Sequence, residues 1–280
     1  MNCVIGLCTK AKGWPSALAE LGYEVQVIEQ TIGLSSGGRV KPDAMAVSNK
    51  FVHAIVFECK SGSFVDHEQI SRYSELRPAD LLRWITVYSS SQFKFDLCFS
   101  VFEFNRNGIE TEIQTYPIMV FGKEFIQKIR DFSLAPLNDK FPIKVGGMLV
   151  PLSYYPFSDQ DEDAVIIPRV LRMLVQVASQ RARGGPSSLA EATFSSEDIV
   201  SQIHPYWKAL STEHRNSLGE RVRRIISRLL ASHGDLRTSL EELENKGGYK
   251  ILSPLKELRE KAELIIAETK TQPTIESFPH

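Results

Sequence analysis

The chain has 280 residues and a formal net charge of −1, from 33 Lys and Arg against 34 Asp and Glu. This charge excludes a protein that coats nucleic acid through its overall charge, although a local basic face is compatible with a net charge near zero. Hydrophobic residues make up 42% and charged residues 24%, which is typical of a globular protein, and the length allows two domains. No apolar run approaches the ~18 residues of a transmembrane helix, and no signal-peptide pattern opens the chain, so we expect a cytoplasmic protein without membrane contact. The four cysteines are scattered, so we expect them to be reduced thiols.

The first half of the chain alternates between extended and helical patterns. Period-two alternation and short apolar runs indicate strands, and wider apolar spacing indicates helices. We expect strands at Tyr23–Ile28, Ala44–Val47, Val52–Phe57, Trp84–Tyr88, Phe95–Phe104 and Glu112–Phe121, and helices at Pro15–Leu21, Asp66–Tyr73 and Lys123–Phe132. This order predicts an α/β fold with a mixed central sheet flanked by helices.

The second and third of these strands are joined by a segment that contains turn-forming residues, so we expect an antiparallel hairpin. A register that sets Ser48 opposite His53 also sets Asp43 opposite Glu58. Side chains directly opposite each other lie about 5 Å apart at Cβ. Lys60 is two residues beyond Glu58 and projects from the same face. The hairpin therefore predicts that Asp43, Glu58 and Lys60 meet, and a slip of one residue would separate them.

Two carboxylates and a lysine are the residues of a metal-dependent phosphodiesterase site. Asp43 and Glu58 suit Mg²⁺ or Mn²⁺, which prefer oxygen ligands. Lys60 suits the positioning of a water molecule or the stabilisation of negative charge on a phosphate. Taken singly, each group has a structural alternative, since Pro-Asp is a common turn dipeptide and charged residues often end a strand. Their combination on so apolar a strand favours catalysis.

The helix that follows adds two polar side chains. Asp66 is suited to cap its N-terminus, with Gln69 three residues later as in a capping box. Gln69 and Tyr73 are four residues apart and therefore share one helical face.

Together these residues resemble the PD-(D/E)xK nuclease superfamily, and the Q-xxx-Y spacing is similar to that of its RecB and Cas4 branch. The resemblance covers residues 15 to 90 and rests on Pro42-Asp43, Glu58-Cys59-Lys60 and Gln69-xxx-Tyr73. It implies a restriction-endonuclease-like fold and Mg²⁺-dependent endonuclease activity. By the same resemblance, Asp43 and Glu58 match the metal ligands and Lys60 the catalytic lysine. Gln69 and Tyr73 match residues that brace the site or touch the substrate.

The resemblance leaves a third metal ligand open. The RecB branch often has a histidine ligand upstream, but no histidine precedes His53 here, and the cysteine cluster of iron–sulfur members is also missing. Many relatives instead place a glutamate on the first helix, which makes Glu20 the candidate, with an exposed helix charge as its alternative reading. Glu29, at the end of a strand, is the rival.

The second half of the chain reads as a connecting segment followed by a helical domain. We expect domains at 1–135 and 191–280, joined by residues 136–190 with a helix at 164–183 and a linker at Gly184–Ser188. Helices are expected from Phe194 through Trp207 and from Ser211, the latter rich in arginine. Two helices, a basic helix, a glycine turn and a strand resemble a winged helix, in which the third helix enters the DNA major groove. The alternative is an amphipathic helix whose arginines face water or a partner domain.

The sequence thus predicts a metal-dependent nuclease acting on DNA, in phage defence, recombination or mobile-element processing. We expect Arg39, Lys41, Arg221, Arg224 and Arg228 to contact DNA. Two alternatives stay open. One is a non-catalytic DNA-binding or adaptor protein on a nuclease-like scaffold, and the other is a subunit of a larger complex that needs a partner. A homodimer is also expected if the protein cuts duplex DNA.

Overall fold

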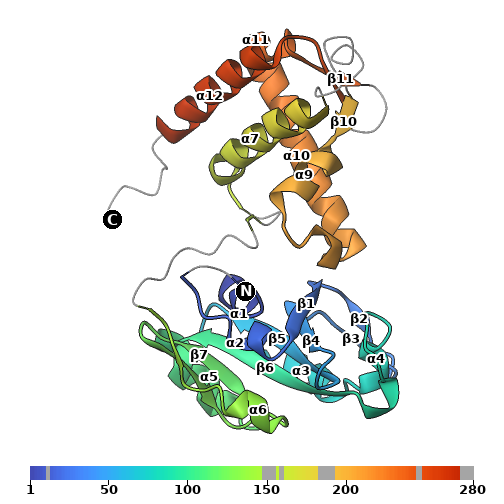
Figure 1. Cartoon of the computed structure of the whole chain (residues 1–280), viewed down its shortest axis with the longest axis vertical. Helices are drawn as coiled ribbons and strands as arrows, with labels where there is room; N and C mark the ends of the chain where they lie inside the picture. Colours follow the sequence, from blue (N-terminus) through green and yellow to red (C-terminus); the bar gives the residue numbers. More distant parts are fainter. Residues whose placement is uncertain (11–12, 147–155, 158–160, 182–192, 244–247, 272–280) are drawn as a thin grey trace. The chain divides into compact units, whose positions relative to one another are not determined.

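The computed structural model describes residues 1–10, 13–146, 156–157, 161–181, 193–243 and 248–271. The chain forms two compact units. The first comprises Met1–Tyr154 and Lys208–Ser211, and the second comprises Tyr155–Trp207 and Thr212–His280. The first unit contains a large sheet, whereas long helices dominate the second (Figure 1).

The first unit combines a seven-stranded sheet with short helices. Its helices are α1 (Asn2–Leu7), α2 (Ala17–Glu20), α3 (His67–Ser74), α4 (Pro78–Leu81), η1 (Ser90–Gln92), η2 (Glu103–Asn105), α5 (Arg106–Glu112) and α6 (Ala135–Asn138). Its strands are β1 (Tyr23–Ile28), β2 (Ile32–Gly33), β3 (Arg39–Val40), β4 (Ala44–Ser48), β5 (His53–Lys60), β6 (Lys94–Phe102), β7 (Ile118–Phe121), β8 (Phe125–Ile129) and β9 (Ile143–Lys144). The expected α/β class with a mixed sheet and flanking helices is therefore confirmed.

The sheet has the strand order β1-β4-β5-β6-β7-β8-β9. The β5–β6 and β6–β7 pairs are parallel, and the other pairs are antiparallel. In the β4–β5 hairpin Ser48 lies opposite His53 and Ala44 opposite Phe57, which confirms the register expected from the sequence. Because β9 pairs with β8 at the sheet edge, the first unit continues past residue 135, where we expected its domain to end.

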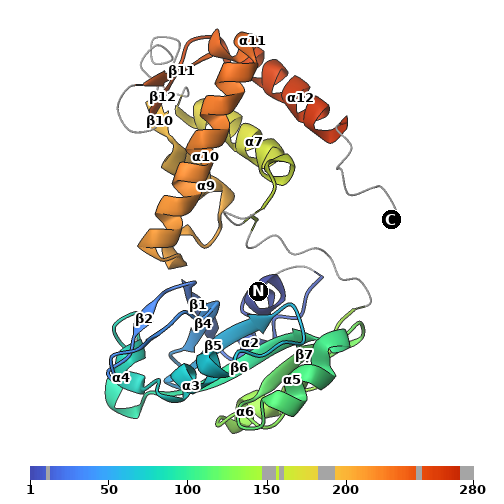
Figure 2. The same cartoon turned by 180° about the vertical axis from the view of Figure 1, so that it is seen from behind.

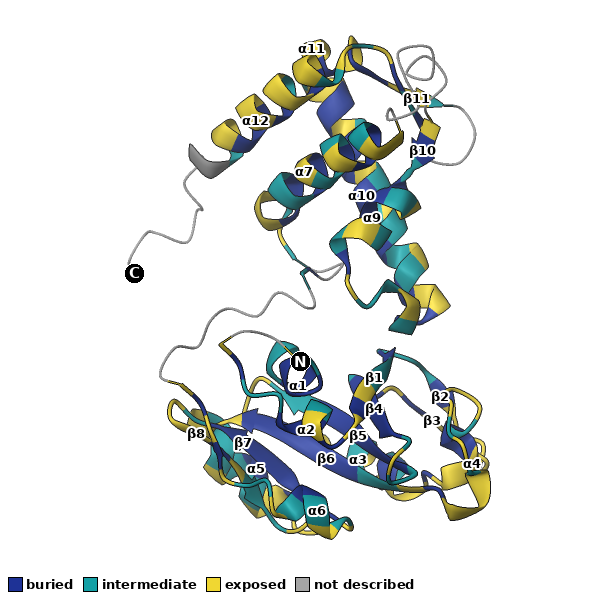
Figure 3. Ribbon diagram, viewed as in Figure 1, coloured by how far each residue is buried: buried dark blue, intermediate teal, exposed yellow. Residues whose placement is uncertain are grey.

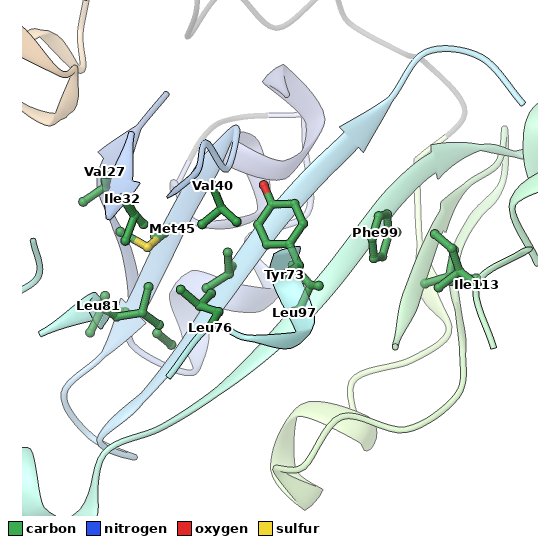
Figure 4. Close-up of a cluster of buried hydrophobic side chains, with 14 of the residues drawn as sticks. Val27, Ile32, Val40, Met45, Tyr73, Leu76, Leu81, Leu97, Phe99 and Ile113 are labelled. Atoms are coloured by element: carbon green, nitrogen blue, oxygen red, sulfur yellow. The ribbon is translucent and has the colours of Figure 1, made fainter. Parts of the chain in front are cut away.

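Both faces of the sheet are covered, and β5 is buried on both of them (Figure 3). Val56 belongs to a cluster that includes Tyr73 of α3 and Leu81 of α4, and Figure 4 shows the latter two side chains over the sheet. Phe57, the next residue, points to the opposite cluster, which includes Leu18 of α2. An apolar strand covered on both faces gives the acidic residues at its end a rigid support.

Three expected elements of this unit are wrong. Residues Trp84–Tyr88 form turns and irregular chain, and their apolar character reflects Ile85, which packs into the core. In the expected strand Glu112–Phe121, the helix α5 ends at Glu112 and the strand starts only at Ile118. The expected helix Lys123–Phe132 is instead the strand β8, in which buried Ile126 lies between exposed neighbours.

The second unit consists of packed helices and a small antiparallel sheet. Its elements are α7 (Asp163–Arg181), β10 (Thr193–Ser195), α9 (Ser196–Ile203), α10 (Thr212–Ser232), α11 (Gly234–Arg237), β11 (Leu240–Leu243), β12 (Gly248–Ile251) and α12 (Leu255–Thr271), and η4 (Trp207–Ala209) spans the division between the units. The sheet order is β10-β12-β11. Helix α7 packs against α9 and α12 (Figures 1 and 2).

The helices of this unit agree in part with the expected ones. The helix expected at 164–183 is α7, whereas residues 182–183 and the expected linker Gly184–Ser188 lie outside the described residues. The helix expected from Phe194 begins only at Ser196, because the preceding residues pair with β12 as a strand. Among the residues that the structure describes, no helix is both long and apolar enough to cross a bilayer.

Candidate active site

The β4–β5 hairpin fixes the position of Asp43. The residue lies just before β4, yet its amide donates to the Phe57 carbonyl at 3.0 Å. The amide of Cys59 in turn donates to Oδ2 of Asp43 at 2.6 Å. Asp43 is therefore held beside the end of β5, but its amide bonds the carbonyl of Phe57, the partner of Ala44, so the regular ladder ends at Ala44 and does not include the expected pair of Asp43 with Glu58.

Glu58 is buried and has three donors. Oε1 accepts from Nε2 of Gln69 at 2.9 Å and lies 3.0 Å from Nζ of Lys60. Oε2 accepts from the hydroxyl of Tyr73 at 2.7 Å. A buried carboxylate without partners would be very costly, and these contacts compensate its charge. The expected neighbourhood of Glu58, Lys60, Gln69 and Tyr73 is thus present.

Gln69 links the two charged groups, because its Oε1 also accepts from Nζ of Lys60 at 2.8 Å. The start of α3 supports this position. Asp66 caps the helix by accepting from the amides of Glu68 and Gln69. The side chain of Gln69 does not complete a capping box with Asp66 but turns to the sheet. One turn later Tyr73, which is 2% exposed, reaches the same carboxylate.

The electrostatics of Asp43 differ from those of an ordinary surface aspartate. Burial, and then repulsion from the Glu58 carboxylate, raise its pKa from 3.8 to about 6, although the bond from the Cys59 amide acts in the opposite direction. Burial raises the pKa of Tyr73 above its usual range, and the Glu58 charge adds to this effect, so its hydroxyl stays a donor.

A pocket of about 240 Å³ opens beside Asp43. Its lining includes Lys60 and Ser61 from the end of β5, and Ser100 and Phe102 from β6. Cys59 also lines it, but burial raises the pKa of this thiol to about 12, so it is not an activated nucleophile.

The β6 residues of this pocket were not expected from the sequence. The strand Phe95–Phe104 was predicted, but its neighbours in the sheet were not. In the structure β5 and β6 are parallel, and Lys60 lies opposite Val101. The carboxyl ends of the two strands therefore lie side by side at one end of the sheet. The sequence signal for parallel pairing was the long connection between the strands, because a tight turn joins antiparallel strands.

The two candidates for a third metal ligand differ in position. Glu20 is exposed on α2, and its contacts are Lys140 at 2.7 Å and Ser16 at 3.3 Å. Glu29 lies beside Asp43, since its amide donates to the Asp43 carbonyl at 3.0 Å and its charge contributes to the raised pKa of Asp43. Among the described residues, the contacts thus favour Glu29 over Glu20.

The donors present fit a hard cation that keeps several water ligands. Asp43 Oδ1 accepts no hydrogen bond from the described residues, and Glu58 Oε2 accepts a single one. The described part of the chain contains no group of three or more His, Cys, Asp or Glu arranged to hold a metal. Two carboxylates with completing waters suit Mg²⁺ better than a metal that needs a full protein cage.

The basic residues expected to contact DNA are in different surroundings. Arg39 is exposed on β3, whereas Lys41 pairs with Glu29 at 3.2 Å. In the second unit Arg221 and Arg228 both pair with Asp163 at the start of α7. Arg224 is exposed. Two of the five basic groups therefore hold α10 against α7.

Comparison with known proteins gives two family matches. The model of the MJECL32 domain matches residues 1–155, and a model described as a domain of unknown function (DUF8601) matches residues 158–274. These ranges agree closely with the two structural units. Neither the curated proteins nor the solved structures contain a match to the chain. Because the first model covers more than half of its length, the chain belongs to the MJECL32 domain family.

Proposed function

We propose that the protein is a metal-dependent nuclease that hydrolyses phosphodiester bonds of DNA. The observation that carries this proposal is the hydrogen-bonded set of Glu58, Lys60, Gln69 and Tyr73 beside Asp43 and an open pocket. A purely structural ion pair would not need a second acid beside it whose pKa is raised by burial and by the charge of the first. Asp43 has a perturbed pKa and lines the pocket, and acids of this kind are typical of functional sites.

In this proposal Asp43 and Glu58 hold Mg²⁺ or Mn²⁺. The bound ion would lower the pKa of a water molecule and offset negative charge on the phosphate. Lys60 uses two of its three N–H groups on Glu58 and Gln69, so the third is available for a phosphate oxygen or the attacking water. Gln69 orients the lysine, and Tyr73 holds the carboxylate of Glu58 in place.

The restriction-endonuclease-like resemblance agrees with these positions, since the acids and the lysine lie on a β-hairpin of a mixed sheet and Gln69 and Tyr73 on the next helix. For the second unit we propose a winged helix. The order α7, β10, α9, α10, β11, β12 with sheet order β10-β12-β11 supports it. In that arrangement α10 would enter the major groove, with Arg224 and Arg228 exposed on it and Arg228 also paired with Asp163.

A second candidate function is supported by the state of Glu58. Its charge is already compensated by Lys60, Gln69 and Tyr73, so the set is stable without a metal. A DNA-binding or adaptor protein on the same scaffold, without turnover, would keep such a network for stability alone. The two functions differ in one respect, because only the nuclease needs Mg²⁺.

The test is cleavage of plasmid and linear DNA by the full chain in Mg²⁺, in Mn²⁺ and in EDTA. We expect cutting that needs the metal and is lost in Asp43→Asn and Lys60→Ala. The matched control is Lys94→Ala, because Lys94 is an exposed lysine at the opposite end of the parallel strands. Cleavage that survives both site variants would remove the assignment. DNA binding without turnover, with and without cell lysate, would favour the adaptor.

A further inference from the structure

Two aromatic rings are exposed at the edge of the sheet that carries the candidate site. Phe102 is 39% exposed and Phe104 is 80% exposed. Their rings are stacked, with centroids 5.7 Å apart and planes 5° from parallel. Single exposed apolar residues are common, but a stacked pair in water needs an explanation, since it leaves a flat aromatic face uncovered.

The backbone ties these rings to the site. Val101 lies opposite Lys60 in the parallel β5–β6 pair, and Phe102, the next residue, is on the other face of the sheet at the same end of the strands. Phe102 also lies opposite Phe121 of β7, and their rings are 6.4 Å apart in an edge-to-face arrangement. Phe102 and Phe121 line the pocket together with Asp43 and Lys60.

A hydrogen bond ties the residue after Phe104 to the end of β5. Asn105, the next residue, donates from Nδ2 to the carbonyl of Ser61 at 2.7 Å. Ser61 directly follows Lys60 and also lines the pocket. Phe104 therefore directly precedes a residue that is hydrogen-bonded to Ser61, and Ser61 is the neighbour of Lys60.

We propose that Phe102 and Phe104 form a stacking platform for one nucleobase of a single-stranded or frayed nucleic acid. This inference rests on the proposed function, because it assigns the substrate class of the same site. The outer face of Phe104 is the exposed surface on which the base lies. The adjacent phosphate then enters the pocket beside Lys60. A base inside a duplex has both faces covered by its neighbours, so this platform selects strands with unstacked bases.

The size of the effect follows from the chemistry of stacking. Loss of one aromatic–base contact weakens single-strand binding by roughly 5- to 100-fold. Binding to a strand of the same length without bases depends on phosphate contacts alone and is not affected by the ring. The difference between these two strands therefore reports the platform directly.

The experiment measures fluorescence anisotropy of the full-length protein with labelled oligothymidylate and with an abasic strand of equal length, in EDTA at one salt concentration. Wild type binds the oligothymidylate more tightly. Phe104→Ala and Phe104→Leu lose this preference and bind the abasic strand as wild type does. Tyr88→Ala is the matched control, because Tyr88 is 84% exposed and its amide is held by Asn49 in the β4–β5 turn, far along the hairpin from Lys60. It keeps the preference.

Three results would overturn the platform. They are equal binding of both strands by wild type, an unchanged preference in Phe104→Ala, and a change in the sedimentation of the protein alone in Phe104→Ala, which would assign the rings to self-association. None of these measurements uses cleavage. Failure of the nuclease proposal therefore appears as an absence of Mg²⁺-dependent products, whereas failure of the platform appears only in binding.

Discussion

Replacement of Asp43 by asparagine should stabilise the first unit while removing activity. Asparagine has the same shape, and its side-chain oxygen can still accept the bond from the Cys59 amide. It carries no charge, so it removes both the cost of burying a carboxylate and the repulsion from Glu58, the two main causes of the raised pKa of Asp43. The substitution therefore isolates the energetic cost of the charge.

The magnitude follows from the pKa. A change from 3.8 in the unfolded chain to about 6 in the folded protein corresponds to about 3 kcal/mol. The folded state binds the proton more tightly than the unfolded state, so stability falls as pH rises from about 4 to about 6. The full energetic cost of the charged Asp43 carboxylate is present above about pH 6 and absent below about pH 4. The gain in Asp43→Asn should follow the same course.

Native-state hydrogen exchange read by mass spectrometry suits this test, because peptides from β4 and β5 report the first unit separately. We expect a gain approaching 3 kcal/mol at pH 8 and none near pH 4, after correction for the intrinsic exchange rates. Asp139→Asn is the control, since Asp139 is an exposed residue of the same unit. A destabilised Asp43→Asn, or a gain of equal size at both pH values, would refute the reasoning.

Three other predictions concern two buried hydrogen bonds and the pKa of Asp43. Tyr73→Phe removes a donor from the buried Glu58 carboxylate and should cost about 1–3 kcal/mol by hydrogen exchange; a loss below about 0.5 kcal/mol would contradict the assigned bond. The affinity for Mg²⁺ should fall about tenfold per pH unit below the Asp43 pKa of about 6, because the proton and the cation compete, and a flat calorimetric profile would exclude this ligand. Tyr23→Phe removes the 2.7 Å bond to Nδ1 of the buried His53 and should lower stability by about 1–2 kcal/mol in the same exchange assay, with an unchanged value as the contrary result.

Local patterns predicted the hairpin and the helix cap of the site. The β4–β5 register could be read from the sequence because the short turn-forming segment between Ser48 and His53 sets which residues lie opposite each other. Asp66 caps α3 through contacts two and three residues away, which the sequence also shows. Nearby residues determine both features.

Long-range partners could not be predicted in this way. Glu20 pairs with Lys140, which is 120 residues away, and no local pattern reports that contact. Arg221 and Arg228 lie two turns apart on α10, a spacing that suits DNA, but the first turn of α7 uses both of them. The strand β8 was misread as a helix because its apolar spacing is ambiguous over so short a segment.

The central claim is that Asp43 and Glu58 share one divalent cation beside Lys60. The most direct measurement is the anomalous difference density of crystals grown with Mn²⁺. The account predicts a single strong peak within ligand distance of both carboxylates, absent in Asp43→Asn. A peak bound elsewhere, or none at a Mn²⁺ concentration that supports cleavage, would contradict it.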